Sequence, residues 1–194
     1  MNVTQVIDKL REDGAFRANL TAWRSFAPQP GRYMPFPDRV APALAEGLKK
    51  RGISNLYTHQ YETFMALESG RNVCVVTPTA SGKTLCYNLP VLNRLLRDPE
   101  SRALYLFPTK ALSQDQVSEL TETIETLEVK IGAYTFDGDT PTSARSAVRN
   151  AGHIVVTNPD MLHAGILPHH TIWIRLFENL KYVVIDEIHH YRGV

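Results

Sequence analysis

Hydrophobic positions along most of this chain alternate between short continuous runs and helical spacing. The continuous runs predict strands at residues 72–76, 103–107, 131–135, 154–157 and 182–185. Between the strands, apolar residues recur with helical periodicity, which predicts helices near residues 83–97, 111–127, 142–150 and 172–177. Strands that are apolar throughout and joined by helical crossovers predict an α/β fold, a parallel sheet with helices on both faces. Ligands bind such sheets at the carboxyl ends of the strands.

The N-terminal part follows a different pattern. Apolar residues at helical spacing predict a short helix, which Gly14 is expected to end: Val3, Val6, Ile7 and Leu10. Residues 27–42 are rich in proline and predict an extended strap. Its larger side chains Arg32, Tyr33 and Phe36 are expected to anchor it, and contact with a ligand is the alternative. A helix at 41–51 follows the strap. We therefore expect an N-terminal accessory helix and strap at 1–52 and a single lobe at 53–194.

Composition narrows the class of protein only slightly. The sequence has 194 residues, of which 43% are hydrophobic and 21% charged, as in a globular protein with one main domain. A net charge of +1 indicates no overall basic field, so nucleic-acid binding would have to come from local loops. No apolar run approaches the roughly 20 residues of a membrane-spanning helix, and we expect a cytoplasmic protein, nucleoid-associated if bacterial. Cys74 and Cys86 match no disulfide or metal pattern and are expected to be buried thiols.

A phosphate-binding loop is predicted at residues 77–84. They read Thr-Pro-Thr-Ala-Ser-Gly-Lys-Thr and lie between a predicted strand and a predicted helix, which is the context such a loop requires. Gly82 lets backbone N–H groups approach the phosphates, Lys83 neutralises phosphate oxygens, and the Thr84 hydroxyl can bind magnesium. Thr77 stands where the usual pattern begins with glycine. The alternative is a turn before an ordinary helix.

An acidic pair, Asp186 and Glu187, follows the apolar run at 182–185. Successive side chains of a strand point in opposite directions, so adjacent acids at its end can divide two tasks. Asp186 is expected to hold Mg²⁺, mostly through water, and Glu187 to polarise the attacking water. The alternative is a solvated acidic turn. Together with the phosphate loop, the pair predicts a nucleotide-hydrolysing motor.

These residues together resemble the first motor lobe of superfamily 2 helicases of the DEAD/DEAH-box type. The resemblance implies a RecA-like fold of the P-loop NTPase class, with ATP and Mg²⁺ as cofactors. It implies catalytic roles for Lys83, Asp186, Glu187 and His189, and metal binding by Thr84 and Asp186. Residues 56–60, Leu-Tyr-Thr-His-Gln, resemble the adenine-recognising element. The nucleotide-binding residues are therefore expected to be Tyr57, Gln60, Thr79, Ala80, Ser81, Gly82, Lys83 and Thr84, although a polar residue at a helix start is the alternative for Gln60.

Two further segments resemble motifs with which these helicases grip a nucleic-acid strand. Residues 108–116 resemble motif Ia and residues 157–162 resemble motif Ib. Each puts hydroxyls, amides and a helix N-terminus at the same edge of the sheet, which suits sequence-independent contact with phosphates. Taken singly, each segment would be an ordinary turn. With a neighbouring loop, the expected nucleic-acid contacts are Pro108, Thr109, Lys110, Gln114, Asp137, Gly138, Arg145, Thr157, Asn158 and Pro159.

From about residue 52 onward, the sequence resembles a branch of these helicases typified by bacterial MrfA/YprA repair proteins and the fungal Hrq relatives of RecQ. The resemblance implies a DNA-stimulated ATPase that moves along single-stranded DNA, 3′ to 5′, in DNA repair, on single-stranded or partly duplex DNA. It also implies a second RecA-like lobe that donates arginines to ATP, and a cysteine-rich module. Neither is contained in the residues up to Val194. We therefore expect a fragment that binds nucleotide and has little or no helicase activity alone.

Other interpretations stay open at this point. An RNA helicase would use the same chemistry, and a small P-loop kinase would need an acceptor pocket and a lid. A third possibility is a non-catalytic nucleotide-binding fragment. The histidines at 163, 169, 170, 189 and 190 match no zinc-ligand spacing, so we expect no zinc site. The resemblance instead places His189 where it links the nucleotide site to the nucleic-acid elements or to the second lobe.

Overall fold

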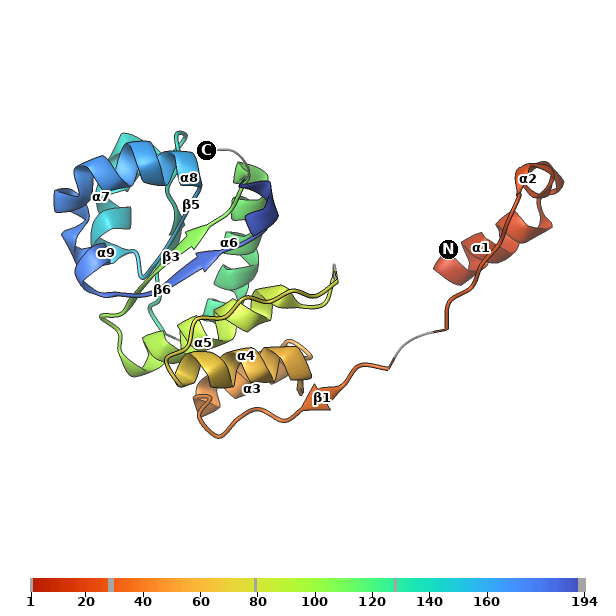
Figure 1. Cartoon of the computed structure of the whole chain (residues 1–194), viewed down its shortest axis with the longest axis horizontal. Coiled ribbons are helices and arrows are strands. Elements are labelled where there is room, and N and C mark those ends of the chain that lie inside the picture. Colours follow the sequence, from red (N-terminus) through yellow and green to blue (C-terminus); the bar gives the residue numbers. More distant parts are fainter. Residues whose placement is uncertain (1, 28–29, 79, 128, 192–194) are drawn as a thin grey trace. The chain divides into compact units, whose positions relative to one another are not determined.

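The chain folds into two compact units, Met1–Gly31 and Arg32–Val194. The computed structural model describes residues 2–27, 30–78, 80–127 and 129–191 (Figure 1). The second unit begins before the boundary expected at residue 52, because helix α3 (Pro42–Lys50) buries Leu44 and Leu48 in its core. The division into an accessory segment at 1–52 and a functional lobe at 53–194 stays a prediction.

The first unit contains helices α1 (Val3–Glu12) and α2 (Gly14–Asn19). Asn2 caps α1 by accepting the Gln5 N–H at 2.9 Å. Helix α1 ends at Glu12, two residues before the expected Gly14, and Gly14 begins α2, because the Asp13 carboxylate accepts the Phe16 N–H at 3.0 Å and caps that second helix. No side chain of either helix is buried, so the apolar face of α1 has no covering within the part of this unit that the structure describes.

The second unit is built on a parallel sheet of four strands: β3 (Arg102–Leu106), β4 (Ala133–Thr135), β5 (Ile154–Thr157) and β6 (Leu180–Ile185). Their order is β4-β5-β3-β6, and every neighbouring pair is parallel. The parallel sheet predicted from the apolar runs is therefore confirmed. All carboxyl ends meet at one edge.

Alternate residues of the central strand face two separate cores. Ala103 and Tyr105 of β3 pack into one core, whereas Leu104 and Leu106 pack into the other. Helices cover the first face: α3, α4 (Thr58–Glu68), α5 (Lys83–Arg97) and α6 (Lys110–Glu125). The second face is covered by α7 (Thr142–Ala151), α8 (Pro159–Met161), the π-helical turn η1 (Leu162–Ile166), the 3₁₀ segment η2 (Leu167–Trp173) and α9 (Ile174–Glu178). Figure 1 shows α3, α4 and α5 together on one side of the sheet and α7, α8 and α9 on the other.

The predicted helices agree with the structure except near two segments. The helix expected at 172–177 is divided between η2 and α9, because Trp173 has the non-helical dihedral angles φ −106° and ψ 17°. Helix α4 was not predicted, since its apolar positions form no clear stripe. In the described ranges, no helix combines the length and the apolar character that a bilayer crossing requires.

The strand predicted at 72–76 is wrong, because the structure has no strand between residues 71 and 78. The segment forms no ladder with β6, which pairs only with β3 among the described strands. Cys74 is consequently exposed, contrary to the expectation, whereas Cys86 is buried as expected. The edge position also explains why side chains of β6 alternate between half-buried and exposed instead of being buried throughout.

The proline-rich strap contains one short regular element that the sequence did not predict. Strand β1 (Tyr33–Met34) pairs antiparallel with β2 (Leu56–Tyr57) just before α4. Phe36 packs against the first core, as an anchor should. Tyr33 is 56% exposed and stacks on Tyr57, with ring centroids 4.9 Å apart. It therefore contributes to a surface aromatic pair and not to the core.

Candidate nucleotide and nucleic-acid site

The carboxyl edge of the sheet gathers most of the predicted site residues. Asp186 directly follows β6, and its N–H donates to the Leu106 carbonyl at 3.0 Å. The residues after β3 lead into α6, and the Phe107 N–H donates to the Thr157 carbonyl at 3.0 Å. Asp137 lies beyond the neighbouring strand β4. The sheet thus places the acidic pair at one end of this edge and the predicted nucleic-acid loops along the rest.

The predicted phosphate loop opens α5 with an unusual backbone. Gly82 is the N-cap of α5 and has φ +77°, and Ala80 has φ +59°. Left-handed residues in a loop turn backbone N–H groups toward a shared concavity, which is the arrangement that binds anions. The Thr77 and Ser81 hydroxyls are 2.7 Å apart and form a hydrogen bond across the loop. Thr79 lies outside the described residues.

Lys83 is held inside this loop. Its ammonium donates to the carbonyl of Thr77 at 3.1 Å and to that of Pro78 at 3.2 Å. These carbonyls hold the ammonium against the start of the loop. A phosphate in the loop would be a stronger partner, because hydrogen bonds between ions are shorter and about twice as strong as neutral ones.

Gln60 is 4% exposed and uses both ends of its amide within the protein. Its Oε1 accepts the Tyr57 N–H and its Nε2 donates to the Gly82 carbonyl, each at 2.8 Å. Gln60 therefore joins α4 to the predicted phosphate loop. Tyr57 is 37% exposed between Tyr33 and His59, which leaves aromatic surface beside the loop. Base recognition by Tyr57 and Gln60 stays a prediction.

The acidic pair has a constrained geometry. One oxygen of the Asp186 carboxylate accepts the Glu187 N–H at 2.9 Å, which orients the side chain. Glu187 has φ +49°, a left-handed conformation that is uncommon for a non-glycine residue. Its carboxylate lies 3.3 Å from Nδ1 of His189. Glu187, His189 and His190 bring potential ligand atoms within 4.8 Å of one another, but both histidines are exposed and Glu187 is a predicted residue of the nucleotide site.

Sequence reasoning missed Tyr87 on α5. Its hydroxyl lies 3.4 Å from the second oxygen of Asp186 and 3.1 Å from Oε1 of Gln116 on α6. Burial, followed by the charge of Asp186, raises the pKa of this phenol well above its usual value. The sequence does contain a signal for Tyr87. It lies three residues after Thr84, a predicted metal ligand, and residues three apart on a helix share a face.

The predicted nucleic-acid residues form a chain of contacts along the sheet edge. The Thr109 hydroxyl caps α6 by accepting the Leu112 N–H at 3.3 Å. Lys110 forms an ion pair with Asp139 at 2.5 Å, which joins the start of α6 to the loop after β4 and raises the Lys110 pKa. Within that loop, Asp137 is buried and its carboxylate accepts the Asp139 N–H at 2.9 Å.

The remaining predicted contacts differ in how accessible they are. Gln114 and Gly138 are exposed. Arg145 donates to the Thr140 carbonyl at 3.1 Å and lies over the Phe136 ring. Thr157 is buried, and its hydroxyl donates to the Phe136 carbonyl, so its side chain orients the edge without facing solvent. Asn158 caps α8, which begins at Pro159, by accepting the Met161 N–H at 2.8 Å.

The donor set fits a nucleotide with Mg²⁺. Thr84 and Asp186 offer hard oxygen ligands, which Mg²⁺ prefers, and the Asp186 carboxylate is already oriented by hydrogen bonds. The loop at Ala80 and Gly82, with the Lys83 ammonium, supplies the positive side of a phosphate site. No soft ligand is part of this set.

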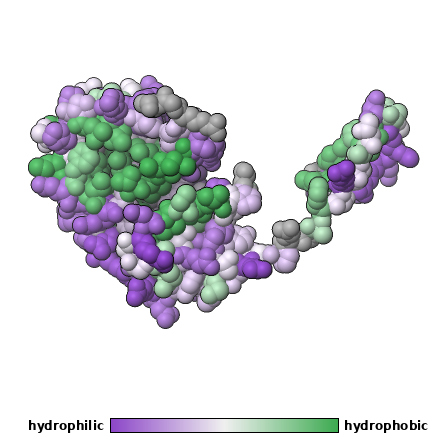
Figure 2. All heavy atoms as spheres, in the orientation of Figure 1, coloured by the Kyte–Doolittle hydropathy of each residue, from purple (hydrophilic) through white to green (hydrophobic). Residues whose placement is uncertain are grey.

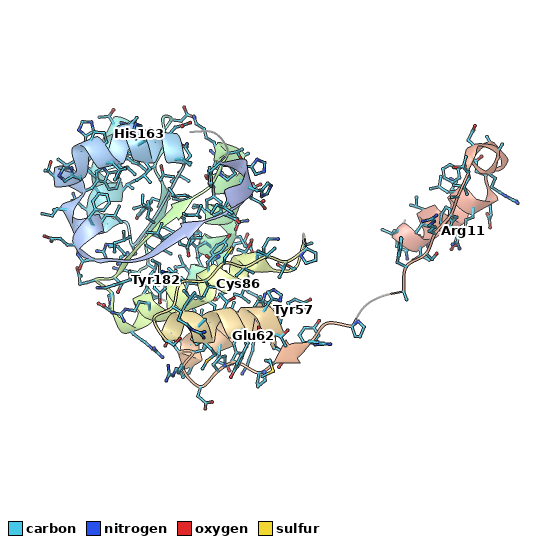
Figure 3. All side chains as sticks on the ribbon, viewed as in Figure 1. Arg11, Tyr57, Glu62, Cys86, His163 and Tyr182 are labelled. Carbon is cyan, nitrogen blue, oxygen red and sulfur yellow. The ribbon has the colours of Figure 1, made fainter. Side chains whose placement is uncertain are left out.

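A hollow of about 610 Å³ adjoins the site. Residues 73–77 form one wall and β6 the other, while Lys83, Asp186 and Glu187 stand among its lining residues. Figure 3 labels Cys86 on α5 and Tyr182 on β6, both of which line this hollow. Burial raises the pKa of the Cys86 thiol to about 11, so the thiol stays protonated and inert at neutral pH.

The sequence profile of the DEAD/DEAH box helicase family matches residues 57–194, and the chain belongs to this family. Within the family it is similar to the MrfA/YprA and Hrq1 branch. It is 53% identical over 193 residues to a Bacillus subtilis (strain 168) protein named "Uncharacterized ATP-dependent helicase YprA", covering 100% of this chain and 25% of the relative. Over 194 residues it is 36% identical to the Saccharomyces cerevisiae "ATP-dependent helicase HRQ1", covering 99% of this chain and 18% of the relative.

Solved structures show the same relationship. The crystal structure of the DUF1998 helicase MrfA bound to DNA and AMPPNP superposes with a TM-score of 0.88 at 52% identity, covering 100% of this chain and 27% of that chain. The predicted helicase resemblance and the RecA-like fold are thereby confirmed. The chain spans about a quarter of the length of YprA and MrfA.

Proposed function

We propose that this chain is the ATP-binding motor lobe of a DNA helicase that moves along single-stranded DNA in DNA repair. The observation that supports the proposal is the oriented acidic pair at the carboxyl edge of the sheet, which shares a hollow with Lys83 and lies on the same edge as loops suited to a nucleic-acid backbone. The relatives named above are helicases, and the MrfA structure contains DNA and AMPPNP. These facts support DNA and ATP as ligands here.

The residues divide the chemistry of ATP hydrolysis among them. Backbone N–H groups around Gly82 and the Lys83 ammonium bind the phosphates. Thr84 and Asp186 would hold Mg²⁺, which would neutralise charge that develops on the phosphate oxygens. Glu187 accepts a proton from the attacking water. His189, which contacts the Glu187 carboxylate, links this step to the nucleic-acid elements or to a second lobe.

The second RecA-like lobe of the whole protein is also part of the proposal. In this class of motor, arginines from another element stabilise the transition state and contribute ~10³ to 10⁵ in rate. In this chain the Asp186 and Glu187 site faces the open hollow. We therefore expect nucleotide binding without efficient turnover from these 194 residues alone.

The proposal is tested by measuring the ATPase activity of the whole protein with single-stranded DNA and with RNA of the same sequence. DNA but not RNA should stimulate hydrolysis. Equal or greater stimulation by RNA would instead support an RNA helicase, and no stimulation by either would reject the motor function.

Lys83→Ala serves as the matched variant in this experiment. Loss of its charge-assisted hydrogen bonds should weaken the binding of a fluorescent ATP analogue roughly 10- to 100-fold. Lys50→Ala, which removes an exposed lysine of α3, is the control and should bind like the unmodified protein. Unchanged binding by Lys83→Ala would show that the loop is not the phosphate site.

A further inference from the structure

The Tyr87 hydroxyl lies between the two halves of the site. One turn before it on α5 is Thr84, and across from it are Asp186 after β6 and Gln116 on α6. The Tyr87 ring is fixed edge-on against the Tyr105 ring, with centroids 5.4 Å apart at 84°. Tyr105 is 1% exposed, so the packing beneath the hydroxyl is firm.

The hydroxyl has one proton and two acceptors. Oε1 of Gln116 is at 3.1 Å and Oδ2 of Asp186 at 3.4 Å, both longer than the 2.7–2.8 Å common for such bonds. A single proton cannot be donated fully to both acceptors. The hydroxyl therefore favours one partner at a time, and a small movement of α5, α6 or Asp186 decides which.

Both acceptors lie on elements with assigned tasks. Asp186 is the expected metal ligand, and its other oxygen is already held by the Glu187 N–H at 2.9 Å. Gln116 is six residues after Lys110, on the helix whose first turn carries the expected nucleic-acid contacts. Lys110 in turn is paired with Asp139 of the neighbouring loop. A displacement of α6 would thus change the distance between Gln116 and the Tyr87 hydroxyl.

We propose that Tyr87 is a positioning residue that couples the metal-binding carboxylate of Asp186 to the nucleic-acid contact at the start of α6. The inference rests on the proposed function. When the hydroxyl donates to Asp186, it orients the carboxylate for the metal, and when it donates to Gln116, that support is lost. Nucleic acid bound at Lys110 would shift this balance through α6. By linkage, nucleotide with Mg²⁺ would shift nucleic-acid affinity by the same factor.

The test is Tyr87→Phe, which removes the hydroxyl and keeps the ring on Tyr105. Binding of a fluorescent ATP analogue to this chain is measured over a range of Mg²⁺ concentrations, with and without a single-stranded DNA oligonucleotide. The Mg²⁺ midpoint should rise about 10-fold, the lower end of the effect of losing a partner of a metal ligand. The factor by which DNA changes nucleotide affinity should fall to about 1.

Tyr134→Phe is the matched control. Tyr134 is 39% exposed on β4, at the opposite end of the strand order from β6, so its variant should keep both the midpoint and the coupling factor. Gln116→Leu should lower the coupling factor as well. The double variant Tyr87→Phe/Gln116→Leu should lower it little further, because both substitutions remove the same hydrogen bond. Thermal unfolding of each variant checks that the fold is retained.

The outcomes separate this inference from the proposed function. If the unmodified chain binds neither the ATP analogue nor DNA, both the function and the inference are rejected. If it binds both ligands and Tyr87→Phe keeps the same Mg²⁺ midpoint and coupling factor, only the role of Tyr87 is rejected. Binding of both ligands without coupling in the unmodified chain also rejects that role.

Discussion

At the scale of single residues, Gly82 shows how the proposed nucleotide loop is bonded to another part of the lobe. Its φ of +77° starts α5 in the left-handed region, and its carbonyl accepts the Gln60 side chain. The glycine was predicted from the sequence because of its loop position. Its contact with Gln60 was not, since 22 residues separate the two and no local pattern reports such a pairing.

We expect Gly82→Ala to impair both folding and nucleotide binding. A Cβ atom there would lie 2.7 Å from Nε2 of Gln60, in addition to the left-handed strain of about 1–2 kcal/mol. Gly70→Ala is the control, because Gly70 has φ +78° and nothing within 4 Å of the added atom. Urea unfolding should show a loss of stability in both variants, whereas only Gly82→Ala should lose affinity for an ATP analogue. Equal nucleotide affinity in the two variants would contradict a role of the contact between Gly82 and Gln60 in nucleotide binding.

At the scale of elements, His153 connects the starts of two strands. It lies just before β5, and its Nδ1 accepts the N–H of Gly132, just before β4, at 3.0 Å. Burial lowers the pKa of His153, and the charges of Arg102 and Arg175 lower it further. The neutral imidazole is therefore the form that the fold favours, because a protonated Nδ1 could not accept this hydrogen bond.

This arrangement predicts a pH-dependent stability. Since the folded-state pKa lies below the unfolded value of about 6.5, the unfolded chain binds the proton more readily. Stability from His153 should be present above about pH 6.5 and be lost as the pH falls through the lowered folded pKa. Urea unfolding between about pH 8 and 5 should show a smaller pH slope for His153→Asn, whose amide can still accept but does not titrate. His163→Asn is the control, because His163 is exposed. If the free energy of unfolding has the same pH slope in both variants, the prediction is rejected.

At the scale of the whole molecule, β6 is an edge strand, since no described strand pairs with its outer side. Val183 and Ile185 of β6 are 53% and 48% exposed, and Val76 across the hollow is 89% exposed. Figure 2 shows hydrophobic residues gathered over the face of the second unit that bears β6. An apolar strand with unpaired backbone groups can pair with another chain.

We therefore expect this chain to self-associate through β6 as its concentration rises. Val183→Lys should reduce the association, because a charge on an edge strand opposes pairing. Ile174→Lys on α9 is the control, since Ile174 is 56% exposed but lies on a helix. Sedimentation velocity over a range of concentrations measures both. A monomeric unmodified chain, or equal effects of the two lysines, would contradict an edge-to-edge contact.

The sequence by itself determined most of the local elements and the family of the protein, and it predicted which residues at the ends of those elements carry the chemistry. Continuous apolar runs predicted β5 at its observed bounds, and the phosphate loop and the acidic pair could be predicted because their residue types are adjacent in the chain. Only the tertiary structure decided which strands are neighbours, because side-chain periodicity reports which face a residue occupies but not what lies beside it. For that reason the exposed coil at 71–78, the open edge of β6 and the position of Tyr87 between Asp186 and Gln116 could not be predicted. Each depends on contacts between segments far apart in the chain.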